Sequence, residues 1–243
     1  MWMASALESE LGAWRGTVWR VVEAQHRIST NRIAASRTEQ EQLERLAEAV
    51  KPELPPAARG LHYLLAAPLR YGHRQPSRFR SADERLGIFY ASEAEETAVA
   101  EAAYWRLKFF SRSPGFVPPV TTSEHSSFSV KVDTTHALDL TRDPLAADRE
   151  RWTAPDDYSA CQDLAREARI AGTELIRTIS ARDAEARCNI VVLNPAAFAA
   201  KAPKMGRTWH LRFEAGRLVA LAAFPSQETF VFTAEGFGLP IMP

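Results

Sequence analysis

The stretch that decides the fold covers residues 87–101 and reads GIFYASEAEETAVAE. It begins with GIFYAS, whose aromatic and β-branched side chains predict a short strand. Ser92 and Glu95 then form an S-x-x-E capping box, which predicts the start of a helix that continues to about residue 112. The chain is therefore expected to turn directly from a strand into a helix.

Helical periodicity places the carboxylate of Glu101 on a face that is otherwise apolar or small. The other members of that face are Ala94, Thr97, Ala98, Tyr104, Trp105 and Phe109. An unpaired carboxylate is costly to bury, so Glu101 must meet a cation, hydrogen-bond donors or a water-filled cleft. Two interpretations follow, a structural ion pair with an arginine or a functional cleft, and the spacing favours neither.

The composition is that of an ordinary globular protein and excludes several functional classes. The chain has 243 residues with 30 basic and 30 acidic side chains, so no net charge draws it to nucleic acid or to an anionic membrane. Cys161 and Cys188 are too few for a disulfide framework, and no ligand spacing indicates a metal. The acidic start, MWMASALESE, is unlike a signal peptide, and no apolar run reaches transmembrane length. We expect a cytoplasmic protein.

The remaining segments predict an α+β fold. Strands are indicated by GTVWRVV (16–22), SSFSVKVD, HALDLT, ELIRTIS, NIVVL and the hairpin TWHLRFEAGRLVALAAF, which turns at AG. Helices are indicated from about residue 32 to the break at KPELPP, and over 156–170. Because strands and helices do not alternate strictly, two small sheets are favoured over a doubly wound parallel sheet. We expect residues 1–243 to form one domain with an extended N-terminal region and a helical insertion at about 30–66.

Three side chains near the strand-to-helix turn suggest a chemistry. Arg78 lies in PSRFR before the strand, Tyr90 lies at the end of the strand, and Glu101 lies on the helix. A guanidinium suits a diphosphate, and an aromatic ring packs on a flat ring or a sugar. A carboxylate can hold ribose hydroxyls and stabilise an oxocarbenium-like centre. Together these are the requirements for breaking the bond between nicotinamide and ribose in NAD.

The sequence resembles the RES-domain toxins, a family named for an Arg, a Glu and a Ser. The matching residues are Arg78 in SRF, Tyr90 in GIFYAS, Glu101 in ETAVAE and Ser180 in TISARD. The intervals of 12 and 11 residues between the first three also look like those of the family. The resemblance covers most of the chain, from near Val18 to near Leu193.

This resemblance implies a fold similar to ADP-ribosyltransferases, with NAD bound as a substrate in a cleft between two small sheets. It implies a toxin encoded beside an Xre-type helix-turn-helix antitoxin that covers the active site. Known members consume NAD: some are phosphorylases or glycohydrolases, and at least one type ADP-ribosylates phosphoribosyl pyrophosphate synthetase. We therefore expect mono-ADP-ribosyl transfer to a protein acceptor, with an NAD phosphorylase or glycohydrolase as the alternative. A non-catalytic binding module with the same fold is a third class.

The expected roles follow from the resemblance and the side-chain chemistry. Arg78 contacts the phosphates or the nicotinamide ribose, Tyr90 packs against or bonds to the nicotinamide side, and Glu101 holds ribose hydroxyls and stabilises positive charge at the anomeric carbon. Ser180 orients Glu101 or the nicotinamide amide, or is an ordinary strand-end serine. Arg20, in the strand VWRVV, is a second phosphate ligand or an edge-strand arginine.

Neighbouring residues are assigned structural roles. Tyr104 and Trp105 are expected in the core. Asp183 is expected to form a surface ion pair with Arg187. The added elements, between Arg20 and Arg78 and between Glu101 and Ser180, are expected to build a surface for a protein acceptor. Docking of the antitoxin and a purely peripheral role are the alternatives.

Overall fold

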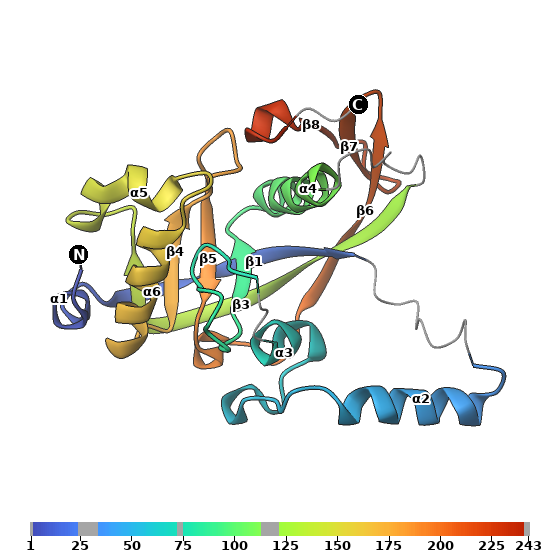
Figure 1. Cartoon of the computed structure of the whole chain (residues 1–243), viewed down its shortest axis with the longest axis horizontal. Helices are drawn as coiled ribbons and strands as arrows, with labels where there is room; N and C mark the ends of the chain where they lie inside the picture. Colours follow the sequence, from blue (N-terminus) through green and yellow to red (C-terminus); the bar gives the residue numbers. More distant parts are fainter. Residues whose placement is uncertain (1, 24–33, 72–74, 113–121, 241–243) are drawn as a thin grey trace.

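The computed structural model of the chain describes residues 2–23, 34–71, 75–112 and 122–240 (Figure 1). Residues 30–33 of the predicted helical insertion lie outside these ranges, as does most of the loop SPGFVPPVTT.

The described strands form one mixed sheet, part of which closes into a ring. They are β1 (Gly12–Glu23), β2 (Phe89–Ser92), β3 (Ser123–Asp139), β4 (Leu175–Ile179), β5 (Cys188–Val192), β6 (Lys204–Glu214), β7 (Arg217–Ala222) and β8 (Thr229–Thr233). Hydrogen bonds connect them in the order β1–β2–β5–β4–β3–β6–β7–β8, and β1 also pairs with β3. This extra pairing closes β1, β2, β5, β4 and β3 into a barrel-like ring. From this ring β6, β7 and β8 continue as an antiparallel extension.

The α+β class is confirmed, but the expectation of two small sheets is wrong for the described strands. The segments SSFSVKVD and HALDLT are one strand, β3, because the threonines between them are β-branched and continue the extended backbone. β3 pairs with β1 between His125 and Ala137, and with β6 between Ser123 and Ser129. One long strand therefore belongs to both the ring and the extension. The hairpin predicted at AG is confirmed, with Ala215 and Gly216 both at positive φ between β6 and β7.

Apolar side chains pack on both faces of the ring because neighbouring strand residues point to opposite sides. One face meets α3 (Tyr63–Arg70), whose leucines pack with Phe89 and Phe128. The other face meets α1 (Ala4–Glu8), α5 (Arg149–Thr153) and α6 (Ser159–Ile170). In Figure 1, α6 lies beside β4, and α1 lies beyond α6. In β2, Phe89 packs in the first cluster and Tyr90 against the second, so this short strand is anchored on both sides.

Helix α4 (Glu95–Ser111) lies against β1 and β2 of the ring and also covers the sheet extension. Its residues Val99, Leu107 and Phe110 pack in a third cluster with Trp209 and Leu218 of the β6–β7 hairpin. Burial of each such side chain contributes roughly 1.5–3 kcal/mol. This packing fixes the rotation of α4 about its own axis, and with it the direction in which Glu101 points.

The predicted capping box does not form, although the helix begins where expected. The N-cap residue of α4 is Ala94, and Ser92 is the last residue of β2. Ser92 Oγ donates to Asn189 Oδ1 at 2.7 Å, and the carboxylate of Glu95 binds the guanidinium of Arg207 at 2.7 Å. Partners from distant strands therefore replace the local cap.

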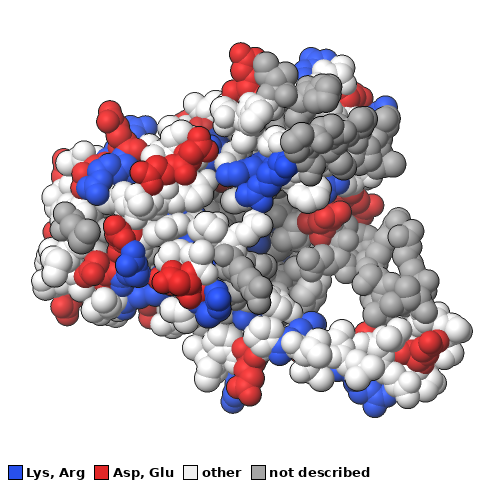
Figure 2. Space-filling view, viewed as in Figure 1, with Lys and Arg blue, Asp and Glu red and all other residues white. Residues whose placement is uncertain are grey.

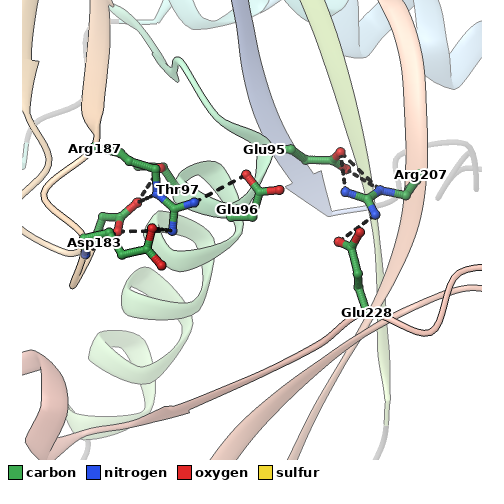
Figure 3. A network of polar contacts seen from close by, with 8 residues as sticks. Glu95, Glu96, Thr97, Asp183, Arg187, Arg207 and Glu228 are labelled. Carbon is green, nitrogen blue, oxygen red and sulfur yellow. Dashed lines mark hydrogen bonds and ion pairs between the residues drawn. The ribbon is translucent and has the colours of Figure 1, made fainter.

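Ion pairs on two sides hold the first turn of α4 (Figure 3). On one side Arg207 of β6 bridges Glu95 and Glu228. On the other side Arg187 lies 3.7 Å from Glu96 and 2.9 Å from Asp183, and Thr97 donates to the same Asp183 carboxylate. The predicted pair between Asp183 and Arg187 is confirmed, but the Asp183 side chain is only 3% exposed and is not on the surface.

The predicted N-terminal helix is present as α2 (Arg37–Ala49). None of its side chains is buried, and it lies away from the sheet at one end of Figure 1. Its C-terminal end is held to α3 by Arg70, which pairs with Glu48 at 2.5 Å.

The described part of the chain lacks a helix long and apolar enough to span a bilayer. In the same ranges no three His, Cys, Asp or Glu side chains lie close enough together to hold a metal ion. On the face shown in Figure 2, basic and acidic side chains are interspersed.

Candidate functional site

A cleft with a volume of about 240 Å³ lies where β1, β2, α4 and the start of α6 meet. Four of the predicted site residues line it: Arg20, Arg78, Tyr90 and Glu101. The fifth, Ser180, is buried behind the cleft wall and contacts Glu101. The structure therefore brings together residues that are widely separated along the chain.

Glu101 is partly buried and is held by hydrogen-bond donors rather than by a cation. Its Oε1 accepts a hydrogen bond from Ser180 Oγ at 2.7 Å and another from Asn189 Nδ2 at 2.5 Å. No lysine or arginine of the described ranges pairs with it. The sequence allowed either a structural ion pair or a cleft around Glu101. The structure shows a cleft.

Both donors bind the same carboxylate oxygen of Glu101. Within the described ranges, Oε2 receives no hydrogen bond. The carboxylate is thus oriented through one oxygen, while the other keeps its capacity to accept a hydrogen bond from a ligand.

Asn189, on β5, is a site residue that the sequence reasoning missed. Its Oδ1 accepts from Ser92, which directs its amide nitrogen toward Glu101. The sequence does contain a feature that could have indicated Asn189, because it is a polar residue inside the otherwise apolar strand CNIVV. Polar residues in buried strands need hydrogen-bond partners. Ser180 lies where the orienting role requires it, and its Oγ also accepts from the backbone N–H of Arg182 at 3.1 Å.

The phenol of Tyr90 is engaged by the protein. Its Oη lies 2.8 Å from Ser77 Oγ and accepts from the backbone N–H of Phe79 at 3.2 Å. Burial raises the pKa of Tyr90. Because Ser77 and Phe79 flank Arg78, the phenol holds the segment that carries this arginine. Tyr90 also lines the cleft, and its expected contact with nicotinamide remains a prediction.

Arg78 is fixed at the cleft wall by two backbone carbonyls and one ring. Its Nη1 donates to the carbonyls of Trp152 and Ala154 at 2.9 and 2.8 Å. Its guanidinium lies 4.8 Å from the ring centre of Tyr158. A guanidinium held in this way is preorganised for an anionic ligand.

Arg20 is the second predicted arginine at the cleft. Its Nη1 donates to the carbonyl of Tyr90 at 2.7 Å, and its guanidinium lies 5.2 Å from the ring centre of Phe89. Burial lowers the pKa of Arg20 to about 10, so it remains charged at neutral pH. Its buried Nε has no partner in the described structure.

The expectation that Tyr104 and Trp105 belong to the core is correct for Tyr104 and wrong for Trp105. Tyr104 is buried, but Trp105 is 45% exposed, and both line the cleft. The buried face of α4 is set by the β6–β7 hairpin and is centred on Val99 and Leu107, not on the predicted stripe. Glu101 therefore lies at the border of the apolar face, where the cleft opens.

Arg182 was also missed, because it lies in the polar run SARDAEAR, which reads as a surface segment. Its side chain is buried, and its Nη2 donates to Tyr104 Oη at 2.8 Å and to the carbonyl of Pro155 at 2.6 Å. It is a third arginine in the cleft wall.

A family model described as the RES domain matches residues 54–214. The chain belongs to the RES domain family. The matched segment includes Arg78, Tyr90, Glu101 and Ser180, and it begins after Arg20 and α2. No curated protein matches the RES-domain chain.

Among solved structures, the chain is similar to one in the crystal structure of the M. tuberculosis MbcT–MbcA toxin–antitoxin complex. The sequence identity is 14% and the TM-score is 0.49. The alignment covers 86% of this chain and 91% of that one.

Proposed function

We propose that this chain is the toxin of a toxin–antitoxin module and breaks the bond between nicotinamide and ribose in NAD. The proposal depends on one observation, the carboxylate of Glu101, which is held through Oε1 by two donors at the wall of an arginine-lined cleft. Family membership supports the choice of NAD as substrate.

The geometry suits that bond cleavage. As the glycosidic bond breaks, its electron pair goes to the nicotinamide nitrogen and positive charge develops on the ribose. A carboxylate beside the anomeric carbon stabilises this charge, and Oε2 accepts from a ribose hydroxyl. Arg20 and Arg78 supply the positive charge that a diphosphate requires.

The acceptor in our primary proposal is a protein side chain, for example on a nucleotide-biosynthesis enzyme such as phosphoribosyl pyrophosphate synthetase. The module acts in the cytoplasm, and an Xre-type antitoxin covers the cleft. The second candidate is an NAD phosphorylase or glycohydrolase. It is favoured by the three arginines of the cleft wall, which suit an anionic acceptor such as phosphate.

Nicotinamide release from NAD by the purified chain tests the proposal. We expect Glu101→Gln to lower the rate by about 10²–10³-fold, because a neutral amide cannot stabilise the developing cation. Glu96→Gln is the matched control, since it neutralises a carboxylate on the same helix that does not line the cleft. A rate for Glu101→Gln equal to that of the control would remove Glu101 from the chemistry.

Mass spectrometry of the products then identifies the acceptor. ADP-ribose attached to a protein supports the transferase, whereas free ADP-ribose or its 1″-phosphate without any target supports the second candidate. Expression without the antitoxin should deplete NAD or modify the target, and a harmless chain that leaves NAD untouched would indicate a binding module.

A further inference from the structure

A pair of tyrosines on the cleft wall has no part in the function proposed above. Tyr104 lies on α4 and Tyr158 directly precedes α6, and Arg182 Nη2 donates to the phenol oxygens of both. Both residues line the same cleft as Glu101.

Cations surround this pair. Arg182 Nη2 donates to Tyr104 Oη at 2.8 Å and to Tyr158 Oη at 3.3 Å. Lys108 Nζ donates to Tyr104 Oη at 2.8 Å and lies 5.8 Å from the ring centre of Tyr158. The guanidinium of Arg78 also lies over the ring of Tyr158, 4.8 Å from the ring centre. A phenol in such a position can lose its proton more easily than one in water.

Arg182 also connects the tyrosine pair to the carboxylate. Its backbone N–H donates to Ser180 Oγ, and Ser180 Oγ donates to Glu101 Oε1. The side chain and the backbone of one buried residue therefore hold the phenols and the carboxylate in a fixed relation on one cleft.

We propose that Tyr158 is the proton acceptor of the reaction, and that its phenolate oxygen takes the proton from the group that attacks the anomeric carbon. The proposal rests on the proposed function, since it assumes that Glu101 stabilises the ribosyl cation in this cleft. It assigns the two sides of the reaction to two residues, Glu101 to the sugar and Tyr158 to the acceptor.

The step balances with an acceptor that carries an O–H or N–H group, such as water or a protein side chain. The bond between nicotinamide and the anomeric carbon breaks, and its electron pair goes to the nicotinamide nitrogen. A lone pair of the acceptor forms the new bond to the anomeric carbon. The acceptor's proton moves to the phenolate of Tyr158, and from there to solvent.

The charges around the pair support this assignment of roles. Burial alone would raise the pKa of Tyr158, but the neighbouring phenol of Tyr104 and the nearby cations outweigh it and hold that pKa below its usual value. Burial and the neighbouring phenol of Tyr158 raise the pKa of Tyr104, so Tyr104 keeps its proton. The charged and titratable groups that act on the pair are Tyr104, Lys108, Arg78, Arg182 and Asp156.

The test is the pH dependence of nicotinamide release from NAD with water as the acceptor, in phosphate-free buffer. The wild-type rate should rise with pH and then level off. The midpoint of this rising limb of the pH–rate profile should lie below the pKa of an ordinary tyrosine. Tyr158→Phe keeps the ring on Arg78 and removes only the oxygen. It should abolish the limb and lower the plateau rate by about 10²–10⁴-fold.

Two further variants keep the test decisive if Tyr158→Phe does not fold. Tyr104→Phe and Lys108→Met remove a neighbouring phenol oxygen and a cation and leave the phenol of Tyr158 in place. Both should move the midpoint to higher pH, a change that a purely structural role of Tyr158 would not produce. An unchanged limb in Tyr158→Phe, or unchanged midpoints in the other two variants, would overturn the proposal.

The two proposals fail in different ways. If the wild-type chain releases no nicotinamide even when phosphate and a cell lysate are supplied as sources of acceptors, or if Glu101→Gln is fully active, the proposed function is wrong. If the rate depends on Glu101 but the limb survives Tyr158→Phe, the function stands and Tyr158 is not the proton acceptor.

Discussion

Ser180 Oγ lies 2.7 Å from Glu101 Oε1, although the two residues are 79 positions apart in the sequence. The serine follows β4 and the glutamate lies on α4, so the contact depends on how the helix packs over the sheet. Asn189 binds the same oxygen from β5. Two strands and one helix therefore set the position of the carboxylate.

We first predict that Ser180→Ala and Asn189→Ala each lower the rate of nicotinamide release by about tenfold or more, because each removes a hydrogen bond to a charged group. Either donor alone still holds Oε1, so the double variant should lose more than the product of the single losses. Steady-state kinetics of the three variants measures this.

Ser127→Ala is the matched control for these variants. Ser127 is a buried, hydrogen-bonded serine at Arg207, and it does not line the cleft. A wild-type rate in the double variant would contradict the orienting role of both residues.

Tyr90→Phe should destabilise the protein and weaken NAD binding. The change leaves the backbone N–H of Phe79 without the phenol that it donates to, which costs about 1–3 kcal/mol. The melting temperature should fall by several degrees, and the KM for NAD should rise as the segment carrying Arg78 loosens. Thermal unfolding and kinetics are the measurements. Tyr63→Phe, at a residue 55% exposed, is the control, and equal melting temperatures for the two variants would count against this role.

The pair between Glu95 and Arg207 predicts an acid-sensitive contribution to stability. Burial alone would raise the pKa of Glu95, but hydrogen bonds from Arg207 and Trp209 outweigh it and hold that pKa below its usual value. A depressed pKa in the folded state stabilises the protein above the usual pKa of glutamate, about 4.3, and this stability is lost as the pH falls through the folded value.

The Glu95→Gln variant should therefore be less stable than wild type at neutral pH, and the difference should shrink as the solution is acidified. Urea unfolding at a series of pH values checks this. Glu53→Gln, at an exposed residue, should show no such convergence. A constant difference for Glu95→Gln at all pH values would be evidence against the pair.

Two leucines show the difference in burial between the peripheral helix α2 and the core helix α4. Leu46 of α2 is 65% exposed, whereas Leu107 of α4 is fully buried in the cluster with Trp209. Leu107→Ala should cost about 2–5 kcal/mol of unfolding free energy, and Leu46→Ala less than about 0.5 kcal/mol. Chemical denaturation measures both, and a large effect at Leu46 would show that α2 is part of the folding core.

Several features could be predicted because they depend on neighbours along the chain. The strand-to-helix turn after Ser92 and the hairpin at Gly216 follow from local side-chain preferences and turn chemistry. The capping box at Ser92 was wrong for a reason that lies outside the local sequence. Asn189 and Arg207 offer hydrogen-bond partners that compete with the helix end.

The sequence by itself determined which chemical groups are available and in what local structure: a carboxylate on a helix, an arginine before a strand, and an α+β order of elements. Only the tertiary structure decided that the carboxylate faces an open cleft, and that Ser180, Asn189 and Arg182 lie around it. Periodicity defines the faces of a helix, but the sheet against which the helix packs decides which face is buried. Here the β6–β7 hairpin buries the face at Val99 and Leu107, and so leaves Glu101 at the border where a ligand can reach it.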